Sequence, residues 1–330
     1  MTTINDVAKL ANVSKAAISR YLSGTLKPKA ETIKRIEAAI AETNYTPNRM
    51  AASIRTKTSN TIAIVIPSAK NIAFAEMSEA INNELAPHGY SMVTYTTNEK
   101  LELEKLASNK IRENRLDGAI FITEPKGNKD MSHIDLLEES GIKTVLINRF
   151  YEPNKYCNIS VDIYKGVKEV IKNLTQNGHR KIGMILGWEH QDQSVVYIKG
   201  YKDQMNLMGL EVDENLIMYS DFEESETVKV IKDLIKRGAD AIFTVSDRLA
   251  LIALDVLEEQ KIDVPEKIAV VSFGNTQFSK LVKLTSLDGH GELIGKMTAQ
   301  MLLKRLQGIE DDRFKLLETK LVVRSTTRKT

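Results

Sequence analysis

The sequence predicts an α/β protein in which a small all-helical segment precedes a long body of two doubly wound parallel sheets. Residues 1–60 contain only short helical patterns, whereas from residue 61 onward short apolar runs alternate with helical stretches. Short, continuously apolar strands separated by crossover helices are typical of parallel sheets that are buried on both faces.

The N-terminal segment is expected to contain three helices, at about 5–11, 15–22 and 31–43. Thr3 and Ser14 precede the first two, where a hydroxyl group can accept hydrogen bonds from the free amides of the opening turn. One small core is predicted from apolar residues at spacings of three to five: Val7, Leu10, Val13, Ile18, Leu22, Ile33, Ile36 and Ile40. The stretch RMAASIRTK that follows has almost no apolar face, so as a helix it needs a partner in order to fold.

The body is expected to form its sheets from eight strands. These lie at 61–67, 91–97, 118–123, 143–148, 181–187, 216–221, 241–245 and 268–273. The intervening helices are expected near 74–88, 101–115, 131–140, 195–209, 224–237 and 248–260. A break between strands at 150–180 predicts two lobes rather than one sheet. Two such lobes form a cleft, and ligands of such sheets bind at the carboxyl ends of the strands.

The composition is that of a globular protein. Of the 330 residues, 42% are hydrophobic and 27% are charged, which suffices for two or three domains with their own cores. The single cysteine excludes an internal disulfide and fits a reducing compartment. The N-terminus has no signal-peptide pattern, and no apolar run approaches the roughly 20 residues that span a bilayer. We therefore expect a cytoplasmic protein without membrane contact.

The charge is divided unevenly along the chain. Residues 1–60 carry ten Lys or Arg against four Asp or Glu, whereas the remainder carries 36 against 40. A cationic segment on a slightly anionic body suggests that the segment meets a polyanion while the body has another task.

The sequence offers no chemistry for catalysis or for a cofactor. No strand is followed by a glycine-rich nucleotide-binding loop, and the five histidines are too scattered for a metal site. The nearest catalytic pair, Ser246 and Asp247, is explained by a helix N-cap followed by an acid in the first turn. We therefore expect neither an enzyme nor a bound cofactor.

Two stretches near the N-terminus and several in the body share a specific pattern. These are INDVAKLANVSKAAISRYL, KAETIKRIEAAIAETNYTPNRMAASI, GHRKIGMILG, KGYKDQM, DFEES, VPEKIAVVSFGNT and LTSLD. The pattern closely resembles the lactose-repressor (LacI/GalR) family of bacterial transcription regulators. The resemblance implies a helix-turn-helix DNA-binding headpiece followed by a two-lobed body like that of periplasmic binding proteins.

The resemblance also implies the domain boundaries. The headpiece covers residues 1–47, the hinge helix and linker cover 48–60, and the effector-binding and dimerisation body covers 61–330. Within the body, the N-lobe consists of about 61–160 and 290–318, and the C-lobe of about 163–286 and 319–330.

The implied function is sequence-specific binding of operator DNA by a homodimer, most simply as a repressor. Each headpiece reads one half-site of a pseudo-palindromic operator with its second helix in the major groove. Activation through the same DNA contacts is an alternative. A sugar-binding receptor shares the two-lobed body, but it is exported and has no headpiece.

Residues of the headpiece and hinge acquire roles by this resemblance. Lys15, Ala16 and Arg20 fall where the family reads bases, and arginine or lysine donating to guanine is the commonest specific contact. Ala17 replaces a usual threonine, which removes one hydroxyl group from the phosphate contacts. Ala51 and Ile54 fall in the hinge, with Ile54 at the position of the leucine that wedges between central base pairs. Phosphate contacts are assigned to Thr3, Ser14, Ser19, Lys29, Thr32, Tyr45 and Asn48.

The cleft residues are assigned in the same way. Ala73 and Phe74 follow the first strand, Phe222 lies in DFEES, and Asp162 lies where the chain crosses between the lobes. Phe74 and Phe222 can stack on a ring of the ligand, although core positions would suit them as well. Trp188 lies in a strand-end loop that can cover the ligand.

The polar anchors of the cleft depart from the family pattern. Tyr197 replaces a usual arginine, Gly274 replaces a usual aspartate, and Asn148 replaces an aspartate that many relatives have. The remaining candidate anchors are Arg149, Arg248 and Asn275. Three kinds of effector stay open: an anionic sugar phosphate or sugar acid, a neutral sugar, or a phosphorylated protein partner.

Overall fold

The structure is a computed structural model, and it describes residues 2–22, 26–46, 58–122, 130–149, 155–189, 192–309 and 312–328. The chain divides into two compact units, Met1–Ser59 and Asn60–Thr330. Each unit has a hydrophobic core of its own, and the second unit is built from two parallel sheets.

The first unit, which we call the headpiece, contains three described helices. They are α1 (Ile4–Leu10), α2 (Lys15–Leu22) and α3 (Ala30–Thr43). Its core consists of six buried side chains, Val7, Ala8, Ala11, Ile18, Ile36 and Ala39. Asn44 ends α3 in the left-handed conformation, with its amide bonded to the last turn of the helix.

The N-lobe sheet has six strands among the described residues, in the order β11-β5-β4-β3-β1-β2, and every neighbouring pair is parallel. Its strands are β1 (Thr61–Ile66), β2 (Ser91–Thr96), β3 (Gly118–Ile122), β4 (Lys143–Ile147), β5 (Asn158–Val161) and β11 (Phe314–Leu317). Its helices are α5 (Ile72–Leu85), α6 (Leu101–Glu113), α7 (Ser132–Glu139) and α13 (Gly291–Leu306), with the short 3-10 helix η1 (Ala86–His88).

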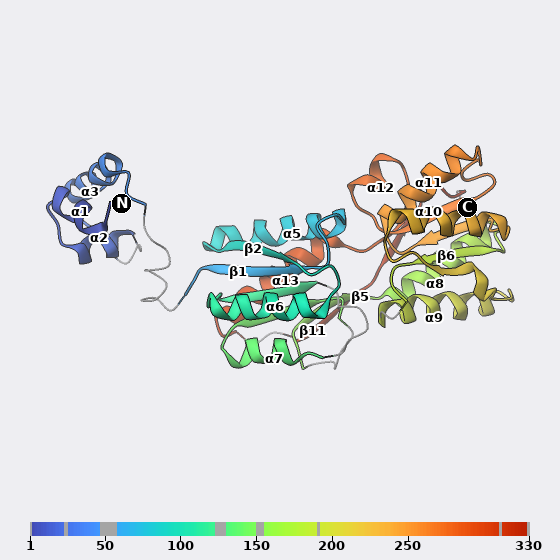
Figure 1. Ribbon diagram of the computed structural model, residues 1–330, viewed down its shortest axis with the longest axis horizontal. Coiled ribbons are helices and arrows are strands. Elements are labelled where there is room, and N and C mark those ends of the chain that lie inside the picture. The colour runs from blue at the N-terminus through green and yellow to red at the C-terminus, as the bar shows by residue number, and fades with distance from the viewer. Residues whose placement is uncertain are drawn as a thin grey trace. The chain divides into compact units, whose positions relative to one another are not determined.

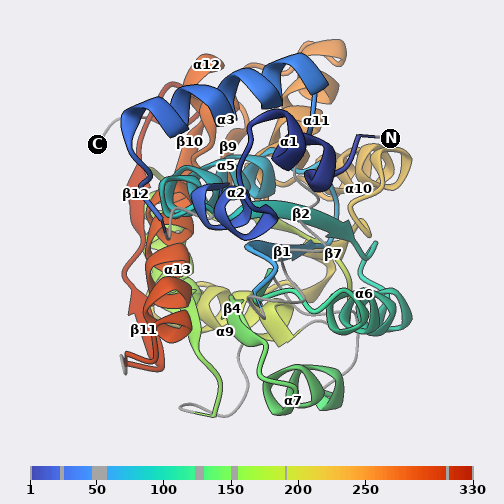
Figure 2. The same ribbon diagram turned by 90° about the vertical axis from the view of Figure 1, so that its left-hand side faces the viewer.

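Two pairs of helices cover this sheet. α5 and α13 pack on one face, whereas α6 and α7 pack on the other (Figures 1 and 2). Gly295 of α13 permits the close contact with α5, because a Cβ atom there would lie 2.7 Å from the carbonyl oxygen of Met77.

The C-lobe sheet repeats this plan, in the order β12-β10-β9-β8-β6-β7. Its strands are β6 (Ile182–Leu186), β7 (Ile217–Tyr219), β8 (Ala241–Thr244), β9 (Ala269–Gly274), β10 (Thr285–Asp288) and β12 (Lys320–Val322), of which β12 is antiparallel to its neighbour. Its helices are α8 (Ile163–Gln176), α9 (Asp192–Leu207), α10 (Glu224–Lys236), α11 (Asp247–Glu259) and α12 (Gln277–Leu281), with η2 (Glu214–Leu216). α8 and α9 cover one face, and α10 and α11 cover the other (Figure 1).

The predicted fold class is confirmed, but the predicted strand break at 150–180 is wrong. The structure places β5 and then α8 in that interval. The strand was missed because Asn158 and Ser160 interrupt its apolar pattern although all four of its residues are buried. For a similar reason β10 was not predicted, since it begins with the buried polar residues Thr285 and Ser286.

Candidate nucleic-acid interface and effector site

Helix α2 is held in the headpiece by one buried side chain and one polar contact. Ile18 is fully buried in the small core, and the Tyr21 hydroxyl group donates to Glu37 of α3 at 2.8 Å. Ser14 accepts a hydrogen bond from the amide of Ala17 at 3.1 Å, so it caps the helix as predicted. The helix therefore has a fixed start and a fixed inner face.

The opposite face of α2 carries the predicted base-reading residues. Lys15, Ala16 and Arg20 are all exposed, and Nε of Arg20 donates to the carbonyl of Ala16 one turn earlier at 3.4 Å. Small Ala16 allows the helix to approach a groove closely, while two long cations flank it. Such a face suits a helix that lies in the major groove of DNA.

The predicted phosphate-contacting residues differ in their exposure and in the hydrogen bonds that they make within the headpiece. The Thr3 hydroxyl and amide both donate to Asp6, at 2.7 and 2.8 Å, and these hydrogen bonds lower the pKa of Asp6. Lys29 stands at the start of α3, is exposed, and makes no capping hydrogen bond with its side chain. Ser14 is exposed and Ser19, Thr32 and Tyr45 are partly exposed. Asn48, Ala51 and Ile54 lie outside the described residues.

In the N-lobe, the predicted effector residues lie at strand ends and helix starts. Ala73 and Phe74 open α5, where Asn71 accepts from the amide of Ala73 at 3.1 Å. Asp162 caps α8 by accepting from the amide of Lys165 at 3.0 Å. Asn148 ends β4 in the left-handed conformation, and its side chain accepts from the amide of Val161 at 3.2 Å. All four predicted residues are partly exposed.

Several hydrogen bonds between described residues join the lobes of the body. Nε2 of Gln193 in α9 donates to the carbonyl of Asn148 at 2.9 Å, and the amide of Gln277 donates to Glu76 of α5 at 2.8 Å. Neither Gln193 nor Glu76 was predicted as a cleft residue. Their residue types carry no signal, since a surface amide and a surface carboxylate are common on helices.

An aromatic pair stands at the carboxyl end of the C-lobe sheet. Trp188 follows β6 and Phe222 follows β7, with their ring centroids 4.5 Å apart at an interplanar angle of 58°. Both are partly exposed. We call this pair the aromatic shelf, because it offers apolar ring surface at a strand end, where ligands of such sheets bind.

One altered anchor position, Tyr197, and one remaining candidate anchor, Asn275, are engaged with other parts of the protein. Tyr197 of α9 is buried against Phe243 and Phe273, with centroid separations of 6.2 and 6.0 Å, and burial raises its pKa well above the ordinary value. Asn275 accepts from Arg324 at 2.6 Å. Tyr197 is therefore a core residue of the C-lobe, and Asn275 is engaged with the C-terminal segment.

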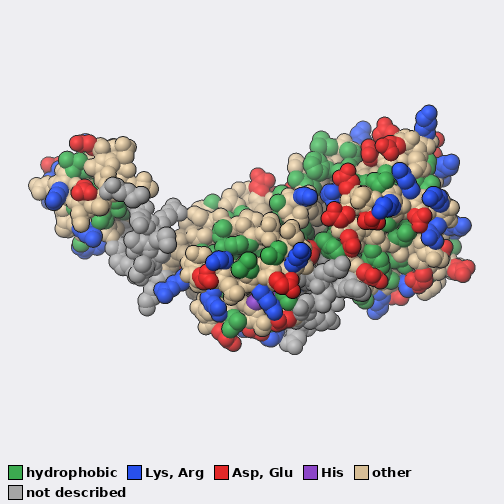
Figure 3. Space-filling model, viewed as in Figure 1, with side chains coloured by type: hydrophobic (Ala, Val, Ile, Leu, Met, Phe, Trp, Pro, Cys, Tyr) green, Lys and Arg blue, Asp and Glu red, His purple; other side chains and the backbone are tan. Residues whose placement is uncertain are grey.

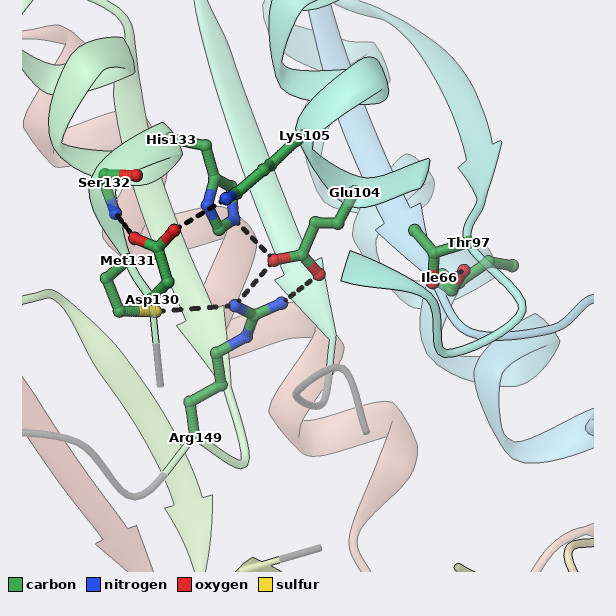
Figure 4. Close-up of polar contacts among 9 residues, drawn as sticks. All are labelled: Ile66, Thr97, Glu104, Lys105, Asp130, Met131, Ser132, His133 and Arg149. Carbon is green, nitrogen blue, oxygen red and sulfur yellow. Dashed lines mark hydrogen bonds and ion pairs between the residues drawn. The ribbon is translucent and has the colours of Figure 1, made fainter. Parts of the chain in front are cut away.

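The prediction that Arg149 anchors the effector is wrong, because its guanidinium group is already paired within the protein. Its side chain is fully buried, and its two terminal nitrogens donate to Glu104 of α6 at 3.0 and 2.6 Å (Figure 4). Nε2 of His133 in α7 lies 2.7 Å from the same carboxylate, and the guanidinium lies 5.4 Å from the ring centre of Phe121. The charge of Arg149 is thus compensated inside the N-lobe, because an unpaired buried charge is costly.

The carboxylate of this Glu104 network is held ionised. Burial by itself raises the pKa of Glu104, but the Arg149 charge and the hydrogen bonds from His133 and Arg149 outweigh burial and lower it. Sequence reasoning missed the network because its members are separated by up to 45 residues along the chain.

Asp247 also departs from its predicted role as a mere first-turn acid. Ser246 does cap α11 by accepting from the amide of Leu249 at 3.3 Å. The Asp247 carboxylate, however, is buried and accepts from the hydroxyls of Ser272, Thr276 and Ser286. This Asp247 cluster ties the start of α11 to strands β9 and β10 and to the start of α12.

The same cluster explains the glycine in the anchor position. Gly274 has φ +144, and a Cβ atom there would lie 3.0 Å from Oδ2 of Asp247. A side-chain carboxylate at 274 would be crowded and repelled by the buried carboxylate of Asp247, so glycine suits this position.

Among the residues that the structure describes, no group of three or more His, Cys, Asp or Glu side chains is arranged to hold a metal ion. None of the described helices combines the length and the apolar character that crossing a membrane requires.

A helix-turn-helix headpiece joined to a two-lobed body defines a DNA-binding protein with a ligand-responsive domain. Residues 3–48 match the model of the lacI family of bacterial regulatory proteins, and residues 171–327 match that of the periplasmic binding protein-like domain. The chain therefore contains the DNA-binding domain described for the lacI family together with a periplasmic binding protein-like domain. It is a DNA-binding transcriptional regulator and not an enzyme.

Similar proteins cover the whole chain. The HTH-type transcriptional regulator CelR of Thermobifida fusca is 29% identical over 98% of both chains. A solved complex of a regulator CelR with cellobiose is 26% identical, with a TM-score of 0.72 over 99% of this chain and 100% of that one. The lac repressor dimer bound to operator and an anti-inducer shares the fold at 24% identity, with a TM-score of 0.84 over 99% of each chain.

Proposed function

We propose that this protein is a cytoplasmic repressor that binds a pseudo-palindromic operator as a homodimer and responds to a neutral carbohydrate in the cleft of its body. The observation that carries the DNA-binding part is the exposed face of α2 with Lys15, Ala16 and Arg20. The headpiece thus offers a reading helix, and its local cationic charge favours a polyanion.

The choice of a neutral ligand rests on the cations of the cleft. Arg149 is neutralised by Glu104, and Nη1 of Arg248 donates to the carbonyl of Phe222 at 2.7 Å. The aromatic shelf can stack on the apolar face of a sugar ring. The cellobiose complex of a similar regulator supports this class, and it makes cellobiose the first compound to test.

The homodimer is supported by an exposed apolar patch on α12. Phe278, Leu281 and Val282 are exposed to 41%, 74% and 44%. Figure 3 shows hydrophobic side chains gathered on the surface of the C-lobe where α12 lies in Figure 1. Exposed apolar side chains that adjoin one another mark an interaction surface. A second copy is the proposed occupant, because a pseudo-palindromic operator requires two headpieces related by a twofold axis.

One pair of variants tests the dimer. We expect Leu281→Asp to give monomers at micromolar concentration in sedimentation velocity, because a buried charge is costly at an apolar interface. Leu207→Asp on α9 is the matched control, since Leu207 is exposed to 71%, and it should leave the dimer intact. A dimeric Leu281→Asp variant would exclude this surface.

One binding experiment tests the function. The full-length protein should select a pseudo-palindromic sequence from random DNA, and sugars that raise its melting temperature should then change its affinity for that DNA. A panel of neutral sugars, sugar phosphates and sugar acids decides the class of ligand. Stabilisation by anionic members alone would refute a neutral effector.

A further inference from the structure

The aromatic shelf is assembled on an unusually tight contact. The Phe222 ring lies over the backbone of Gly187, since a Cβ atom at 187 would lie 1.9 Å from Cε2 and 2.4 Å from Cζ of that ring. Gly187 is therefore required for the observed ring position. On the other side, the hydroxyl of Ser194 donates to the carbonyl of Trp188 at 2.9 Å and holds that half of the shelf.

The backbone that carries Phe222 is in a strained conformation. Asp221 and Phe222 are consecutive residues with φ +50 and φ +56, a region that bulky side chains rarely adopt. The amides of Ser220 and Asp221 donate to the carbonyls of Leu186 and Gly187, each at 3.1 Å. These hydrogen bonds hold the entry to the turn, but they do not engage the carbonyl of Phe222 itself.

Arg248 engages that carbonyl from α11. Its Nη1 donates to the carbonyl oxygen of Phe222 at 2.7 Å, and its Nη2 lies 3.6 Å from Glu224. The helix that carries Arg248 is itself well anchored, because Ser246 caps it and the buried carboxylate of Asp247 accepts three hydroxyl groups. The guanidinium thus links a rigid helix start to the strained turn.

We propose that Arg248 is a positioning residue for effector recognition, which holds the Asp221–Phe222 turn and thereby keeps the Phe222 ring against Trp188. The inference rests on the proposed function, since it describes how the effector site is built. The positive charge of Arg248 faces a protein carbonyl and Glu224. A ligand beside the aromatic shelf therefore contacts the ring faces of Trp188 and Phe222. The assigned class of ligand is a molecule with a flat apolar face, such as a pyranose ring.

Trp188 makes the proposal testable without any ligand, because it is the only tryptophan in the chain. In the full-length protein, Arg248→Met should raise the acrylamide quenching constant of tryptophan fluorescence about twofold, since the turn opens locally. Arg248→Lys keeps one donor and should fall between that variant and the wild type. Arg237→Met, which removes an exposed arginine paired with Asp233 on α10, should match the wild type.

A second variant displaces the Phe222 ring of the aromatic shelf directly, without changing Arg248. Gly187→Ala places a methyl group inside the volume of the Phe222 ring and should increase quenching to a similar extent. If Arg248 acts by holding this ring, the double variant should quench no more than either single variant. Wild-type quenching in Arg248→Met, or additive effects in the double variant, would overturn the proposal.

Cellobiose titration, followed by tryptophan emission, separates this proposal from the proposed function. If the wild type binds cellobiose, Arg248→Met should weaken binding about tenfold, because the preformed site is lost, and Arg248→Lys should restore part of it. DNA affinity without sugar should stay unchanged in both variants. If no sugar binds the wild type, the proposed effector class fails, while the quenching experiment still decides the role of Arg248.

Discussion

The charged side chains of the headpiece and of the effector cleft differ in their surroundings: those of the headpiece are exposed, and those of the cleft are paired with other protein groups. In the headpiece, Lys15 and Arg20 stand exposed on one face of α2. In the body, the arginines expected to serve as anchors are turned to the protein, Arg149 to Glu104 and Arg248 to the carbonyl of Phe222. The two cleft arginines are paired with protein acceptors, whereas Lys15 and Arg20 keep their side chains at the surface, where a polyanion can reach them.

The difference in size between the two hydrophobic cores explains why arginine is buried in the body and exposed in the headpiece. Among the described residues of the headpiece, the core contains six buried side chains, none of which is charged, and the long polar side chains remain at the surface. The N-lobe is large enough to enclose an ionic network, in which Arg149 and His133 both lie at hydrogen-bonding distance from the Glu104 carboxylate. A local motif therefore predicted exposed candidate residues in the headpiece, but no local motif predicted how the arginines of the cleft are paired.

The largest expected effect concerns Arg149, and it tests whether this residue is structural. Arg149→Leu leaves the Glu104 carboxylate buried without its main partner and should lower the free energy of unfolding of the body by about 3–5 kcal/mol. Urea unfolding followed by Trp188 fluorescence measures this loss. Arg112→Leu, an exposed arginine of α6, should change stability by less than about 0.5 kcal/mol.

The double variant sharpens this prediction. Glu104→Leu together with Arg149→Leu removes both charges and should recover a large part of the loss, because no charge is left unpaired. If Arg149→Leu instead kept wild-type stability and lost effector binding, Arg149 would be a ligand anchor after all and the contrast between the regions would fail.

Arg20 should show the reverse behaviour. Arg20→Ala should weaken binding to the selected operator by about 1–3 kcal/mol, roughly 5- to 150-fold, because a cation that reads a base edge is lost. Fluorescence anisotropy at fixed salt measures this. The melting temperature should stay at the wild-type value, since the side chain is exposed.

Lys34→Ala on α3 is the charge-matched control for Arg20. This substitution also removes one exposed cation from the headpiece. It should weaken the binding of operator DNA and of nonspecific DNA to a similar, small extent. Equal loss of operator selectivity in both variants would show that the effect of Arg20 is charge alone.

Acid should affect the body through Glu104. Because the pKa of Glu104 is lowered in the folded protein, its contribution to stability is fully present above the ordinary value of 4.5. It is lost as the pH falls through the lower folded pKa. Glu104→Gln should be less stable at pH 7 and should show a flatter loss of stability below pH 4.5, as measured by urea unfolding.

The headpiece provides the comparison for this titration. The pKa of Asp6 is lowered as well, by hydrogen bonds from Thr3, but Asp6 is exposed. Asp6→Asn should therefore change the acid dependence of stability much less than Glu104→Gln does. An equal change in the two variants would remove the distinction between an exposed and an enclosed carboxylate.

The smallest expected effect is a gain in DNA affinity. Ala17→Thr restores the hydroxyl that the family usually places in the first turn of α2 and should strengthen DNA binding by about 0.5–1.5 kcal/mol. Because phosphate contacts carry no base information, operator and nonspecific DNA should gain alike. A gain confined to the operator would assign position 17 to base reading.

Much of the fold was predictable because it depends on local patterns. Helices α2 and α3 and strands such as β1 and β3 lie within one residue of the expected bounds, since continuous apolar runs and capping residues mark them. The strands β5 and β10 were not predictable from such patterns, because their buried Asn, Ser and Thr residues are compensated by partners from distant segments.

The sequence by itself determined the resemblance to lacI-type regulators, the helix α2 and the α/β alternation, because each is encoded in residues a few positions apart. Only the tertiary structure decided what the cleft residues do. It enclosed Arg149 with Glu104 and His133, placed Asp247 under three hydroxyls, and set Arg248 on the carbonyl of Phe222. The physical reason is that the cost of burying a charge depends on its neighbours in space, and those neighbours come from separate strands and helices.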